Sequence, residues 1–138
     1  MSEANKATAM RFYEEVVAQG NLDLIDELVH ENHVEHEEFP GLNPGREGVK
    51  EFFGMFRNAF PDLKFTVEDM MADGDKVVAR VTVEGTHRGP FLDMEPTGHT
   101  ISVPTVDIMR FADGKMVEHW GVTNELRMMQ DLGIIPEE

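Results

Sequence analysis

The chain has 138 residues, with 12 basic against 27 acidic side chains, a formal net charge of −15, and no cysteine. This length predicts a single domain over residues 1–138 that can bury a core of its own. The lack of cysteine excludes disulfide scaffolds, thiol catalysis and zinc ribbons. The strong negative charge disfavours nucleic acid and anionic membrane surfaces as partners.

The N-terminal residues do not form a basic segment followed by an apolar stretch, and no apolar run approaches the roughly 20 residues of a membrane span. We therefore expect a cytoplasmic protein that does not associate with membranes. Glycine-rich nucleotide-binding motifs and the G-x-S-x-G motif are also absent from the sequence. A bound nucleotide cofactor is not expected.

The first part of the chain predicts three helices. Apolar residues at helical spacing predict a helix that ends at Gly20 and a shorter helix over residues 22–29. An extended segment over residues 31–37 follows. After a loop rich in proline and glycine, a third helix begins near Arg46 and stops at Pro61.

The second part of the chain predicts strands, because the apolar period changes from 3.6 residues to 2 at Leu63. Leu63, Phe65, Val67, Asp69 and Met71 then share one face of the first strand. Asp-Gly turns divide the strands into two antiparallel pairs. The expected strands span residues 63–71, 76–87, 101–111 and 115–122.

A short C-terminal helix is expected after the strands, capped by Thr123 or Asn124, with Leu126, Met129 and Leu132 facing inward. Helices followed by a run of long antiparallel strands indicate an α+β fold, in which a curved antiparallel sheet wraps over three N-terminal helices. Such a sheet encloses a pocket suited to a small hydrophobic molecule.

Asp107 is the first candidate for chemistry, because it lies in an apolar series on the face of its strand that should be buried. Burying an ionisable group without a partner costs several kcal/mol and is seldom accidental. The buried carboxyl suits a general acid or base. The alternative is a structural role, in which Asp107 only accepts hydrogen bonds.

The residue opposite Asp107 depends on the turn between the last two strands. A two-residue turn, Asp113-Gly114, places Asp107 opposite Trp120, whereas a three-residue turn with a bulge places it opposite His119. The bulged register is favoured because it avoids burying Glu118. A carboxylate paired with an imidazole fixes the histidine tautomer and leaves the other nitrogen free to move a proton.

Histidines and acids alternate in the stretch Asn32–Glu37, which is not expected to bind a metal ion. On an extended strand, residues three apart point to opposite faces, unlike the two histidines of a helical H-E-x-x-H motif. We interpret this stretch as a solvated acidic strand. His36 shares a face with apolar Val34 and is expected to point into the pocket.

Several stretches together resemble one family: residues 21–28, 34–36, 44–53, 113–120 and 126–133. They are similar to the SnoaL-like polyketide cyclases, over nearly the whole chain. The resemblance implies the cone-shaped α+β fold of nuclear transport factor two, shared with scytalone dehydratase and ketosteroid isomerase. It also implies ring closure by intramolecular aldol condensation, with an acidic residue as base and with neither cofactor nor metal.

The residue pattern differs from the family at the expected base. Relatives commonly carry a histidine where this chain has Asp107, and an acid shortly after the tryptophan, where this chain has Gly121 and Asn124. Three alternatives follow. Asp107 could replace the missing base from the facing strand, His119 could serve as the base, or the aldol activity could be absent. For Asn124, a helix cap is the alternative to a functional role.

These observations predict a cofactor-independent enzyme acting on a small apolar carbonyl or ester compound, with no metal ion. Asp107 and His119 transfer protons, and His36 and Asn124 orient substrate oxygens. The predicted pocket walls are Tyr13, Phe53 and Trp120. The alternative is a protein that binds small hydrophobic molecules without chemistry.

We also expect a homodimer. The outer face of the predicted sheet carries Val78, Val106 and Ile108, an apolar patch that a second copy can cover. The relatives that the sequence resembles are often dimers.

Overall fold

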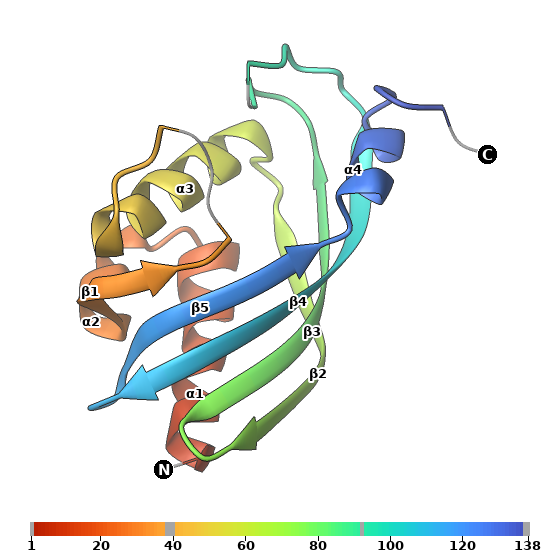
Figure 1. Ribbon diagram of the computed structural model, residues 1–138. Coiled ribbons are helices and arrows are strands. Elements are labelled where there is room, and N and C mark those ends of the chain that lie inside the picture. The colour runs from red at the N-terminus through yellow and green to blue at the C-terminus, as the bar shows by residue number, and fades with distance from the viewer. Residues whose placement is uncertain (1, 38–40, 92, 137–138) are drawn as a thin grey trace.

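The structure, a computed structural model, describes residues 2–37, 41–91 and 93–136. Helix α1 continues directly into a π-helical segment, η1, and a short 3₁₀ turn, η2, leads into α2 (Figure 1). The helical elements are α1 (Ser2–Arg11), η1 (Phe12–Ala18), η2 (Leu22–Leu24), α2 (Ile25–Leu28), α3 (Gly45–Ala59) and α4 (Glu125–Asp131). The strands are β1 (Val29–Glu35), β2 (Lys64–Asp73), β3 (Lys76–Thr86), β4 (Thr100–Ala112) and β5 (Lys115–Thr123).

The five strands form one curved sheet in the order β1-β5-β4-β3-β2, with the N-terminal helices and α3 on its concave side (Figure 1). The predicted α+β fold is therefore confirmed. The sheet is mixed rather than purely antiparallel, because β1 pairs with β5 in parallel while the other neighbours are antiparallel. This parallel pairing brings the acidic segment of β1 beside His119.

The core lies between the sheet and the helices. Alternate residues of β3 and β4, such as Val81 and Val103, are fully buried against the helical layer, which contributes Val16, Val17 and Ala59. Burying such apolar side chains is the main favourable term in folding. None of the described helices is long and apolar enough to cross a membrane.

A bulge in β2 changes which of its residues face the core. The register shifts between Val67 and Asp69, so Met70 pairs with Ala79 and packs against the core, while Met71 is 56% exposed. The expectation that Asp69 and Met71 share a face with Val67 was wrong. The extra residue of a bulge reverses the alternation of side chains beyond it.

A second bulge sets the register between β4 and β5, and neither predicted register is right. The turn does have two residues, Asp113 and Gly114, both with positive φ, as a type I′ turn requires. Beyond it, Val117 is an extra residue, because Met116 pairs with Phe111 whereas Glu118 pairs with Arg110. As a result Asp107 lies opposite Gly121, and His119 lies opposite Met109.

Helix α4 begins as the sequence predicts, with the side chain of Asn124 accepting a hydrogen bond of 3.0 Å from the Arg127 backbone N–H. The expected inward face is only partly right. Leu132 is buried, but Leu126 is 59% exposed and Met128 packs against the core instead. The helix is two turns long and contacts the sheet mainly through β4, so it buries a narrow stripe.

Candidate active site

Asp107 is buried on the concave face of β4 and binds two hydrogen-bond donors. The Tyr13 hydroxyl donates to Oδ2 at 2.5 Å, and His119 Nε2 donates to Oδ1 at 2.8 Å. The expected pairing of Asp107 with His119 is thus confirmed, although it arises diagonally across the ladder rather than between directly opposed residues. Tyr13 comes from η1, where a π-helical turn places it under the sheet.

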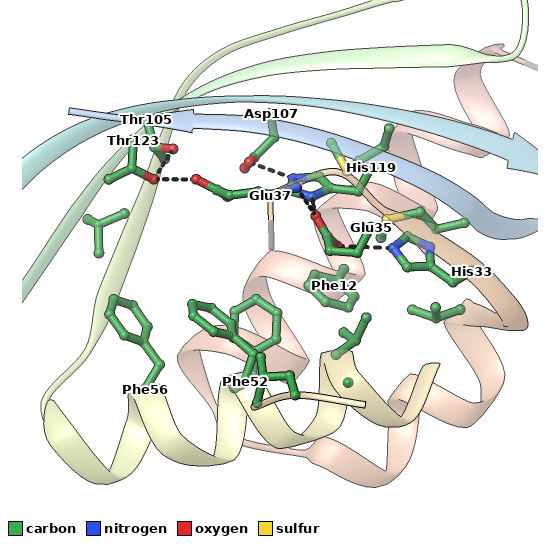
Figure 2. Close-up of a pocket in the computed structure, with 18 of the residues that line it drawn as sticks. Phe12, His33, Glu35, Glu37, Phe52, Phe56, Thr105, Asp107, His119 and Thr123 are labelled. Carbon is green, nitrogen blue, oxygen red and sulfur yellow. Dashed lines mark hydrogen bonds and ion pairs between the residues drawn. The ribbon is translucent and has the colours of Figure 1, made fainter. Parts of the chain in front are cut away.

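The second nitrogen of His119 is not free, because Nδ1 donates to a carboxylate oxygen of Glu35. The parallel register places Glu35 directly beside His119. Glu35 also accepts hydrogen bonds of 3.1 Å from His33 Nε2 and from the backbone N–H of Glu37. Figure 2 shows the resulting row along the sheet, with His119 between two carboxylates.

These contacts make His119 an imidazolium. Burial favours the neutral ring, but hydrogen bonds to Asp107 and Glu35 outweigh burial and raise the pKa of His119 to about 10. Burial likewise favours a neutral Glu35, yet hydrogen bonds from His119 and His33 lower the pKa of Glu35 to about 2. Burial, with the charge of Asp107, raises the pKa of Tyr13, which therefore stays a neutral donor.

The pKa shift of His119 predicts how stability changes with pH. A histidine pKa raised from 6.5 to about 10 contributes stability that is complete below about pH 6.5 and is lost as the pH rises toward 10. We expect the free energy of unfolding, measured with urea between pH 5 and pH 10, to fall over this range. The His119→Gln variant should lack that fall. Parallel curves for the two proteins would contradict a charged His119 at neutral pH.

Glu37 is the third carboxylate of the site. It is half-buried just after β1, and Thr123 Oγ1 donates to its Oε2 at 3.0 Å. Burial raises the pKa of Glu37 above its ordinary value. Ligand atoms of Glu37, Asp107 and His119 lie within 4.8 Å of one another, a spacing compatible with a metal ion. A protonated imidazole has no lone pair for a metal, so metal binding would require His119 to lose its proton.

A cavity of about 940 Å³ lies between the sheet and the helices and contains this row in its wall. The acids and His119 line its sheet side, while aromatic side chains line the helical side, including Phe12, Phe52 and Phe56 (Figure 2). Methionines from the sheet and α4 complete an irregular apolar surface. The cavity is large enough for a multi-ring organic compound.

Four of the seven predicted site residues line this cavity: Tyr13, Phe53, Asp107 and His119. His36, Trp120 and Asn124 are not among its lining residues. The rings of His36 and Trp120 stack on each other with centroids 4.9 Å apart, and His36 Nε2 is 2.7 Å from a carboxylate oxygen of Glu118.

The expectation that His36 points into the pocket was wrong. His36 does not line the cavity and Val34, which reaches its edge, is 48% exposed, whereas His33 and Glu35 on the opposite face of β1 line the cavity beside His119. Sequence reasoning therefore missed Glu35 and Glu37. The available signal was that His33, Glu35 and Glu37 stand at every second position, a spacing that puts side chains on one face of an extended segment.

A sequence profile of the SnoaL-like polyketide cyclases matches residues 7–132. Nogalonic acid methyl ester cyclase of Streptomyces nogalater is 28% identical over 107 residues, which are 72% of this chain and 76% of that protein.

Two solved structures are also similar. AclR of Streptomyces galilaeus, described as a candidate hydroxylase, is 30% identical with a TM-score of 0.86, over 100% of this chain and 86% of its own. IdmH of Streptomyces antibioticus, a candidate polyketide cyclase, is 31% identical with a TM-score of 0.80, over 94% of this chain and 98% of its own.

Proposed function

Because the chain belongs to the SnoaL-like polyketide cyclase family, we propose that it is a cofactor-independent enzyme that cyclises or isomerises a small hydrophobic carbonyl compound by proton abstraction. The observation that carries this proposal is the pairing of Asp107 with the His119 imidazolium in the wall of a largely apolar cavity. Buried ionisable groups of this kind, placed beside a cavity, are typical of acid–base catalysis.

In this proposal Asp107 removes a proton from the carbon next to a substrate carbonyl. A carboxylate has about four acceptor positions, so the bonds from Tyr13 and His119 leave two for the substrate. The C–H electron pair passes into an enolate, whose negative charge the nearby imidazolium stabilises. The enolate carbon then attacks a second carbonyl carbon of the same molecule and closes a ring.

The alternative, a binding protein without chemistry, is favoured by one observation. The polar groups of the Asp107–His119–Glu35 row already satisfy one another, as they would in a purely structural network. AclR is described as a candidate hydroxylase, which would be another reaction class. The fold alone therefore does not decide the chemistry.

Two probes test the proposal. We expect the wild-type protein to accelerate the exchange of the α-protons of 2-tetralone for deuterium in D₂O, because this reaction needs only a base. NMR measures the exchange. The second probe is ring closure of nogalonic acid methyl ester, monitored by chromatography, which also requires formation of a carbon–carbon bond. A protein that raises its melting temperature with these compounds but accelerates neither reaction would be a binder, and the enzymatic proposal would fail.

We further propose that the protein is a homodimer formed through the convex face of the sheet. Val106 and Val122 pair across β4 and β5 on that face and are 42% and 74% exposed. A second copy can cover such a patch. A monomer at micromolar concentration in sedimentation experiments would contradict this.

A further inference from the structure

Gly121 leaves a space in β5 directly opposite Asp107. A Cβ atom at this position would lie 2.5 Å from Oε1 of Glu37 and 3.1 Å from Oδ1 of Asp107. Real side chains do not approach so closely, so the lack of a side chain at Gly121 is what admits the Glu37 carboxylate. The carboxylate of Glu37, from the segment just after β1, thus lies where a side chain of β5 would otherwise project.

The two carboxylate oxygens of Glu37 differ in their hydrogen bonds. Thr123 donates to Oε2, and no donor to Oε1 occurs among the residues that the structure describes. Asp107 differs, because both of its oxygens accept hydrogen bonds. Figure 2 shows Glu37 and Asp107 side by side on the sheet wall of the cavity, with Thr123 at the outer end.

The charges around Glu37 differ from those around the other two carboxylates of the site. Three carboxylates, those of Glu35, Glu37 and Asp107, surround a single cation, His119. Glu35 and Asp107 each bind an N–H group of that cation, whereas Glu37 binds only a neutral hydroxyl. Burial and the neighbouring negative charges then favour the neutral form of Glu37 and raise its pKa.

We propose that Glu37 is the general acid of the reaction, which protonates the carbonyl oxygen attacked during ring closure. This assignment rests on the proposed function and adds a second catalytic residue to it. Its carboxylate comes from the segment directly after β1 and lies in the wall of the cavity.

The proton balance needs no further reactant. Asp107 takes the α-proton as the C–H bond breaks, and the enolate carbon forms the new C–C bond. The attacked carbonyl oxygen forms an O–H bond with the proton of Glu37, which becomes a carboxylate. The proton on Asp107 then passes to Glu37, whose carboxylate lies within 4.8 Å of Asp107 and His119, and both groups regain their starting states.

The Glu37→Gln variant separates the two proton transfers. Glutamine keeps an acceptor for Thr123 but cannot donate a carboxyl proton. We expect ring closure of nogalonic acid methyl ester to slow by roughly a hundredfold or more, the usual effect of losing a positioned acid. Proton exchange of 2-tetralone, which does not need that acid, should stay within about threefold of wild type. Glu14→Gln, the same substitution at an exposed position of η1, is the control and should change neither reaction.

Other outcomes overturn the assignment in distinguishable ways. If Glu37→Gln retains ring closure, or loses exchange together with ring closure, Glu37 is not the acid, while the proposed function survives. If the wild-type protein catalyses neither reaction, both proposals fail. Carboxyl ¹³C NMR gives a readout apart from activity: a Glu37 that titrates at or below the ordinary value of 4.5 would also overturn the assignment.

Discussion

Replacing Asp107 by asparagine is expected to lower turnover by roughly a hundredfold or more, because a positioned general base contributes about this much. Asparagine has the same shape and keeps one acceptor for Tyr13 or His119, so folding should be retained. The two probe reactions and the melting temperature, measured on one preparation, provide the test. Both α-proton exchange and ring closure should fall, unlike the result expected for Glu37→Gln.

A different outcome would reassign Asp107. If turnover survives while the free energy of unfolding falls by about 1 to 3 kcal/mol, Asp107 is a structural hydrogen-bond acceptor. If turnover survives in this variant but His119→Gln abolishes it, the proton transfer belongs to His119. If neither substitution matters, the enzymatic proposal loses its main support.

Replacing His119 by glutamine is expected to destabilise the fold by about 3 to 5 kcal/mol, the usual cost of removing one partner from a buried ion pair. The substitution leaves Glu35, Glu37 and Asp107 together with no cation among them, in a chain whose net charge is already −15. Urea unfolding at pH 7 measures the loss. His36→Gln is the control, because the His36 side chain is 42% exposed outside the cavity, so its pair with Glu118 should add little to stability.

The double variant Glu35→Gln with His119→Gln sharpens this test. It removes a cation and an anion together, so it should be more stable than His119→Gln alone. A double variant less stable than the single one would show that shape and hydrogen bonding, rather than charge, hold the row together. A loss below about 1 kcal/mol for His119→Gln would contradict the buried ion pair itself.

The sequence predicts burial correctly for side chains in regular strands, where inward-facing and outward-facing residues simply alternate. Asp107 stands out because β4 is regular along its whole length, so its apolar neighbours correctly identify the buried face. The change of period at Leu63 likewise separates helices from strands. The pairing of Asp107 with His119 was expected for the wrong register, since the bulge lies within β5 rather than at the turn.

The remaining part of the site depends on contacts between distant segments. Glu35 and Glu37 lie in an acidic stretch that looks solvated in isolation, and only the parallel pairing of β1 with β5 places them beside His119. Tyr13 was expected to be a wall residue, but its hydroxyl also binds Asp107, 94 positions along the chain. Neither contact leaves a periodic pattern, so local spacing cannot reveal it.

The bulge at Val117 also determines where the chain tolerates a change of length. Val117 and Glu118 together lie opposite Arg110, while Met116 and His119 both face inward. Deleting Val117 would therefore leave a regular ladder with His119 still beside Asp107. An added residue between the turn and His119 that no bulge absorbs would instead turn His119 to the opposite face. The strand can therefore lose the residue two positions before His119 and keep the site, so this point of β5 tolerates a shorter chain.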